Sequence, residues 1–88
     1  MTAHLRGALV TLRTTHVPGG IFVAQVSVGS RRLRPKVRFR YDGRPVHART
    51  RLSALVRARP GTRHTLIARV SAGRATRTLK LTLTGCAS

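Results

Sequence analysis

The feature that most constrains the fold is a run of alternating basic and apolar residues at positions 36–52, KVRFRYDGRPVHARTRL, which Asp42-Gly43 interrupts. Apolar residues occupy odd positions before the Asp-Gly pair and even positions after it. Asp-Gly is typical of a type I′ turn, in which both central residues need a positive φ. A two-residue turn places Phe39 opposite Val46, so the apolar residues of both arms lie on one face. The run therefore predicts a β-hairpin.

Five further segments have the apolar pattern and length of strands, and they end at turn residues. Together with the two arms of the hairpin they predict strands at residues 7–14, 21–28, 36–41, 44–52, 53–58, 64–71 and 77–84. No segment has a helical period. About seven short strands are typical of an all-β, antiparallel β-sandwich, with a β-barrel as the alternative. Because 88 residues support only one thin core, we expect a single domain over residues 1–88.

The charge balance is extreme, since 18 Lys and Arg residues face one acidic residue, Asp42, and the net charge is +17. GC-rich codons favour arginine, but Asp and Glu also have GC-rich codons. The scarcity of acids is therefore a signal in itself. A field of this sign attracts polyanions, including nucleic acid and cell-wall polyphosphate, without selecting among them.

The polar face of the predicted hairpin concentrates this charge. In the register set by the turn, Lys36 lies opposite Arg49. Arg38 lies opposite His47. Like charges at opposed positions destabilise a sheet by up to ~1 kcal/mol per pair, which an anionic partner would offset. In the alternative interpretation the arginines are solvated, screened by salt and serve only to block edge pairing. The candidate polyanion-binding residues are Arg34, Lys36, Arg38, Arg40, Arg49 and Arg51.

Neither a catalytic nor a metal centre is expected. Paired catalytic carboxylates are impossible with one acid, and a Ser-His-Asp arrangement would need Asp42, which the turn already explains. The four histidines and Cys86 lack the spacings that pre-orient zinc ligands. His64 is interpreted as the anchor of the turn after residues 60–61, with its ring bonded to a buried backbone group. The sequence thus predicts a protein that is not an enzyme and has no metal and no cofactor.

Targeting signals are also missing from the sequence. No apolar run approaches the ~20 residues of a membrane-spanning helix. Residues 1–17 contain Arg6 and Arg13 and have no sustained apolar centre, so no signal peptide is predicted. The single Cys86 excludes an intramolecular disulfide. We expect a cytoplasmic protein if the chain is complete, or else a piece of a longer exported protein. A truncated or unexpressed gene product also fits the missing export signal.

Several motifs resemble those of bacterial Ig-like domains, which are repeat modules of secreted and cell-surface proteins. They are a Pro-Gly-Gly at residues 18–20, a V-x-F-x-Y-D-G run at residues 37–43 and a P-G-x-x-H-T-L-x-A-x-V run at residues 60–70, followed by a Thr/Leu strand that ends near Cys86. The resemblance covers residues 18–84. It implies an Ig-like antiparallel β-sandwich, neighbouring domains in a longer protein, and a location outside the cell or at its surface. It implies no catalytic residues.

Two functions are consistent with these features. The first is a non-catalytic structural or adhesive Ig-like module of a surface or secreted assembly, with an Arg-rich face that contacts polyanions. The alternative is a small Arg-rich β-protein that binds nucleic acid through phosphates without sequence specificity. Because no recognition helix and no exposed stacking aromatic is predicted, such binding would depend steeply on salt and read no bases.

Overall fold

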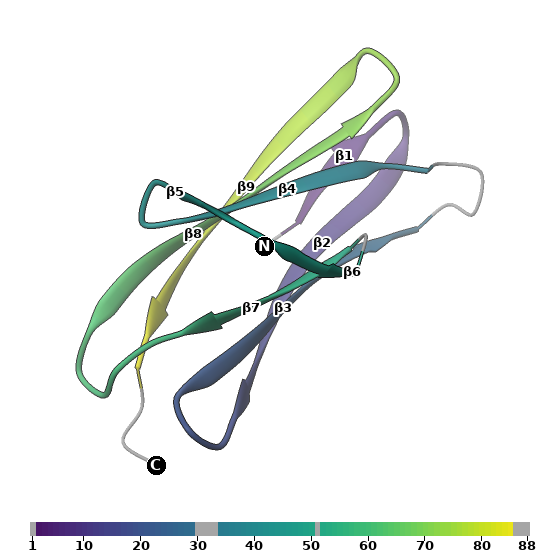
Figure 1. Cartoon of the computed structure of the whole chain (residues 1–88). Helices are drawn as coiled ribbons and strands as arrows, with labels where there is room; N and C mark the ends of the chain where they lie inside the picture. Colours follow the sequence, from purple (N-terminus) through teal and green to yellow (C-terminus); the bar gives the residue numbers. More distant parts are fainter. Residues whose placement is uncertain (1, 30–33, 51, 86–88) are drawn as a thin grey trace.

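The computed structural model describes residues 2–29, 34–50 and 52–85, and within them the chain is all-β (Figure 1). The strands are β1 Thr2–Leu5, β2 Ala8–Val17, β3 Ile21–Val28, β4 Lys36–Tyr41, β5 Arg44–Val46, β6 Ala48–Thr50, β7 Ser53–Arg57, β8 Arg63–Ala72 and β9 Ala75–Thr84. They form two antiparallel sheets, with the orders β1-β2-β3-β7-β6 and β5-β4-β8-β9. Figure 1 shows the long β2–β3 hairpin in one layer and the long β8–β9 hairpin in the other. The prediction of an all-β, antiparallel fold is confirmed.

The Asp42-Gly43 turn forms as predicted. Asp42 has a φ of 51° and Gly43 a φ of 80°, so both central residues have the positive φ that a type I′ turn requires. Phe39 pairs with Val46 across the hairpin. The local turn chemistry therefore fixes the register of β4 against β5.

The predicted number of about seven strands is wrong, since the described residues form nine. β1 was missed because its four residues carry no clear apolar alternation. The predicted strand at 44–52 is two strands in different sheets: β5 pairs with β4, and β6 pairs with β7. Alternation cannot reveal this change of sheet, because both sheets direct their apolar residues toward the same core.

An aliphatic core lies between the two sheets. Leu12 and Val26 contribute from one sheet and Leu66 and Leu79 from the other, each with an exposed fraction of 1% or less. Small residues such as Ala24 are also fully buried, which allows the two layers to approach closely. No polar or charged side chain of the described residues is buried, so their charged groups lie at the surface of the protein.

Hydrogen bonds join the two layers directly. The Tyr41 hydroxyl on β4 donates to the carbonyl of Arg57 on β7 at 2.7 Å. Arg77 Nε on β9 donates to the carbonyl of His4 on β1 at 2.9 Å. Partial burial raises the pKa of the Tyr41 hydroxyl, and the charge of Asp42 raises it further. The stacking of the layers is thus fixed by specific bonds as well as by the core.

Candidate polyanion-binding face

The outward side chains of β4, β8 and β9 form a basic face on one layer of the protein. We define the basic face as Lys36, Arg38, Arg40, Ile67, Arg69, Ser71, Thr76 and Thr78. Its four cations are all exposed. They point outward because their strand neighbours, Phe39 on β4 and Ala68 and Val70 on β8, are buried and successive side chains alternate between faces.

The centre of the basic face is a pair of arginines at opposed positions. Arg38 on β4 is the direct partner of Arg69 on β8. The Cβ atoms of opposed residues lie about 5 Å apart, and both arginines line the same two hollows. Lys36 and Arg40 follow on either side of Arg38 along β4. The arrangement concentrates positive charge on a patch one to two strands wide.

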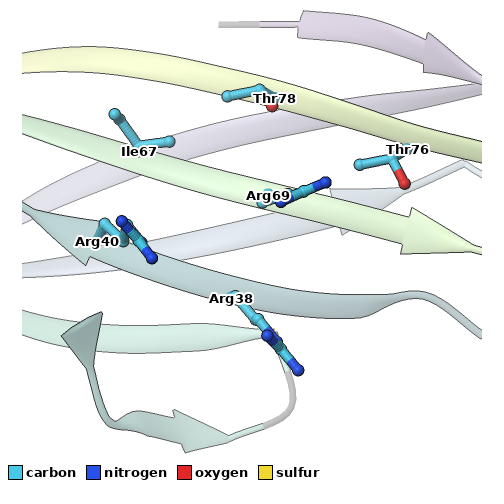
Figure 2. A pocket seen from close by; sticks show the side chains of 6 residues that line it. All are labelled: Arg38, Arg40, Ile67, Arg69, Thr76 and Thr78. Carbon is cyan, nitrogen blue, oxygen red and sulfur yellow. The ribbon is translucent and has the colours of Figure 1, made fainter. Parts of the chain in front are cut away.

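A shallow trough runs over this patch. A hollow of about 360 Å³ is lined by Arg38, Arg40, Ile67, Arg69, Thr76 and Thr78 (Figure 2). A second hollow of about 270 Å³ is lined by Lys36, Arg38, Arg69 and Ser71. The two hollows share Arg38 and Arg69. Figure 2 shows the three arginines on the β4 and β8 side and the threonines on the β9 side. Guanidinium and hydroxyl groups are both donors to anionic oxygens.

The structure brings together only part of the predicted site. Lys36, Arg38 and Arg40 share the outward face of β4, and Arg34 is exposed just before that strand. Arg49 is exposed on β6, which belongs to the other sheet. Arg51 lies outside the described residues.

The predicted cross-strand charge pairs are wrong. Neither Lys36 with Arg49 nor Arg38 with His47 forms, because β5 ends at Val46 and the chain then crosses to the other sheet. The partner of Lys36 is Ser71, and that of Arg38 is Arg69. A like-charge pair does exist, but its second member comes from β8.

Sequence reasoning missed Arg69 as a site residue. The apolar alternation of the predicted strand at residues 64–71 placed Leu66, Ala68 and Val70 inward, so an outward Arg69 was implied. The sequence pattern did not indicate which strand pairs with β4 on the side opposite β5. That pairing joins segments distant in the chain, and no turn sets its register.

The single acidic side chain, that of Asp42, forms its hydrogen bonds away from the basic face. Its Oδ1 accepts a hydrogen bond from the backbone N–H of Thr65 at 2.9 Å, and its Oδ2 is 2.5 Å from Nδ1 of His64. The His64 ring also stacks on Tyr41, with ring centroids 4.9 Å apart. Because the sequence has no other Asp or Glu, no acidic side chain remains to neutralise Arg38 or Arg69.

The far nitrogen of His64, Nε2, lies 2.8 Å from the Thr62 hydroxyl, which itself donates to the carbonyl of Arg59 at 2.6 Å. His64 therefore anchors the loop after residues 60–61, as predicted, but its partners are side chains and not the expected backbone group. The order carboxylate, imidazole, hydroxyl is that of a hydrolytic triad. Here, however, the hydroxyl proton is directed at the Arg59 carbonyl, and the chain of bonds links the β4–β5 turn to the loop before β8.

We expect the Asp42 carboxylate to make stability depend on pH in the acidic range. The hydrogen bond with His64, and then the one from Thr65, lower the pKa of Asp42 below its ordinary value of 3.8. A lowered pKa in the folded state means that this contribution is present above the unfolded-state pKa and is lost as pH falls through the folded-state pKa. Asp42→Asn retains a favourable Asn-Gly turn but removes the carboxylate.

The measurement is the urea midpoint of wild type and Asp42→Asn from about pH 5 down to pH 2. The wild-type midpoint should fall toward that of the variant as pH decreases. A constant difference between the two midpoints across this pH range would show that ionisation of the Asp42 carboxylate does not contribute to stability. The interpretation is direct because Asp42 is the only acidic side chain.

The opposed arginines should reduce the stability of the free protein. We expect Arg69→Gln to raise the free energy of unfolding by about 0.5 kcal/mol at low salt, because like charges at opposed positions repel. The gain should shrink at high salt. Arg13→Gln is the matched control, since Arg13 is exposed on β2 and its partner is the neutral Gln25. If Arg69→Gln and Arg13→Gln change the free energy of unfolding equally in urea, the gain comes from the lower net charge and not from relief of the repulsion between Arg38 and Arg69.

The described part of the chain offers little for other kinds of site. No group of three or more His, Cys, Asp or Glu residues within it is placed to hold a metal ion. Nor does it contain a helix long and apolar enough to cross a membrane. The sequence matches no protein-family model, no curated protein and no solved structure. The functional argument therefore depends on the geometry and charge of the basic face.

Proposed function

We propose that this chain is a non-catalytic, Ig-like structural or adhesive module of a surface or secreted assembly, and that its basic face binds polyanions. The strand order supports the Ig-like assignment. An Ig constant-type sandwich has strands A-B-E-D in one sheet and C-F-G in the other, and related types add C′ beside C. Here β2-β3-β7-β6 follows the first order and β5-β4-β8-β9 follows C′-C-F-G, with β1 as an additional edge strand.

The observation that carries the polyanion proposal is the opposed pair Arg38 and Arg69 in a surface without a neutralising acid. Opposed like charges cost stability, and arginine forks bind phosphate-type oxygens in a bidentate manner. Lys36 and Arg40 extend the same patch along β4. A polyanion bound at this pair would offset the repulsion between Arg38 and Arg69, because each arginine would be attracted to the ligand.

Nucleic acid is one polyanion that this face would accept, as is a cell-wall polyphosphate. The outward positions of β4, β8 and β9 in the described residues carry no Phe, Tyr or Trp on which bases could stack. Tyr41 and Phe39 have the inward parity. Binding of nucleic acid would therefore use phosphates alone and show no sequence preference.

The experiment is a titration of the protein with random-sequence duplex DNA across a salt series, with a glycerol phosphate polymer as competitor. We expect log affinity to fall linearly with log salt concentration, because phosphate contacts release counterions. We also expect the competitor to displace the DNA. Absence of binding at about 0.15 M salt would overturn the proposal.

A further inference from the structure

We propose that the ligand of the basic face is a single extended phosphodiester chain without bases, in which successive phosphates are six bonds apart, and that it lies along β4. A glycerol phosphate polymer joined through the two terminal hydroxyls of each glycerol has this repeat. The inference rests on the proposed polyanion function and adds the class of ligand.

The spacing of the cations carries the argument. Lys36, Arg38 and Arg40 occupy alternate positions of one strand, so they repeat every two residues. Two residues of strand contain six backbone bonds and span about 6.6 Å. A phosphodiester with three carbons between its phosphates also has six bonds from one phosphorus to the next, and bonds of similar length give it an extended repeat of about 6–7 Å. One such chain can place a phosphate beside each cation in turn.

The neighbouring strands favour a single chain. On β8 and β9 the outward cations are separated by neutral residues, so β4 is the only strand of this sheet with three successive outward cations among the described residues. Arg69 approaches the middle of that row from β8, opposite Arg38. Beyond Arg69 lies Thr78, its partner on β9, which also lines the trough. Hydroxyl donors therefore lie at the far side of the trough, two strands from the cationic row.

The lack of aromatic side chains argues against a base-bearing ligand. Proteins that hold single-stranded nucleic acid combine a cationic groove with aromatic rings on which bases stack. In the described residues the outward apolar side chain of this trough is Ile67, which offers no stacking surface. Bases would add no specific contact here, so the backbone is the recognised element.

The experiment uses synthetic phosphodiester oligomers with equal numbers of phosphates and with two, three or six carbons in each linker. The three-carbon oligomer should bind about tenfold more tightly than the six-carbon one and also more tightly than the two-carbon one, although the latter has the higher charge density. Its log–log salt slope should be about −2, because one phosphate lies beside each of the three cations of β4 and each phosphate contributes about 0.7. In Arg38→Gln/Arg69→Gln the slope should weaken by about 0.7, because both arginines face the same phosphate.

The outcomes separate this inference from the function on which it rests. If affinity simply follows charge density across the linker series, the inference is overturned and polyanion binding stands. An oligothymidylate that binds much more tightly than the three-carbon oligomer of equal charge would replace the proposed ligand with single-stranded nucleic acid. The polyanion function itself fails if no oligomer binds, or if Arg13→Gln/Arg57→Gln on the other sheet weakens binding as much as the Arg38/Arg69 variant.

Discussion

Replacing both Arg38 and Arg69 with glutamate is expected to weaken polyanion binding by at least about 100-fold, since in the proposed function each arginine would form charge-assisted hydrogen bonds to the ligand worth about 1.5–3 kcal/mol. The two residues are opposed on β4 and β8 and line the same hollows. Glutamate removes both donors and adds repulsion toward the ligand. The measurement is the affinity for a phosphodiester oligomer at fixed salt.

A charge-matched control separates a local effect from a general one. Arg13 on β2 and Arg57 on β7 are exposed on the other sheet, so Arg13→Glu/Arg57→Glu changes the net charge by the same amount. This variant should lose far less affinity, because only long-range attraction is reduced. Similar losses in the two double variants would contradict a localised site. Both should remain folded, since all four side chains are exposed.

Replacing Gly85 with alanine is expected to destabilise the protein by about 3 kcal/mol or more, a large share of the stability of a domain of this size. Gly85 is buried after β9, where an added Cβ would overlap the carbonyl oxygen of Arg59 and crowd that of Ala58. These are backbone atoms, which cannot rotate away as a side chain would.

The backbone of Gly85 also ties the segment just after β9 to the loop before β8. Its N–H donates to the carbonyl of Thr62 at 2.9 Å, and its carbonyl accepts from the N–H of Gly61 at 3.1 Å. A shift that relieved the overlap would strain these bonds. Gly29→Ala is the control, because there a Cβ meets its nearest atom, the Leu9 carbonyl oxygen, at an ordinary 3.5 Å. Urea unfolding of both variants tests the prediction, and equal stability of the two would contradict it.

The hairpin could be predicted from the sequence because its determinants are local. Asp42-Gly43 specifies the turn, and the turn sets the pairing of Phe39 with Val46. Alternation likewise assigned inward and outward residues, so Leu66 was expected in the core and is fully buried. Period and turn chemistry were therefore sufficient to assign the inward and outward faces of the long strands, but not to find the short β1 or to divide β5 from β6.

Pairing between distant strands could not be predicted in the same way. The partner of Arg38 was expected on the following strand and is instead Arg69. The chain changes sheet near His47, where the apolar pattern continues without interruption because both layers share one core. The contact between Asp42 and His64 was missed for the same reason: it depends on how the β4–β5 turn meets β8 in space. Non-local pairing carries no signature in a single strand.

In the proposed function, stability and binding oppose each other at the basic face. A neutral side chain opposite Arg38 would suit the free sheet better than a second arginine, yet Arg69 occupies that position. The Asp42 carboxylate, which would offset this repulsion if it lay nearby, instead stabilises a turn and a loop. In the proposed function, the ligand supplies the missing negative charge.

The most direct test of the central claim is to map the bound polyanion on backbone amide signals by NMR during titration with a three-carbon phosphodiester oligomer. We expect the largest shift changes along β4 and at the adjacent positions of β8 and β9, and small changes along β2 and β3 of the other sheet. Changes that spread evenly over both sheets, or that concentrate on β2 and β3, would contradict a binding site centred on Arg38 and Arg69.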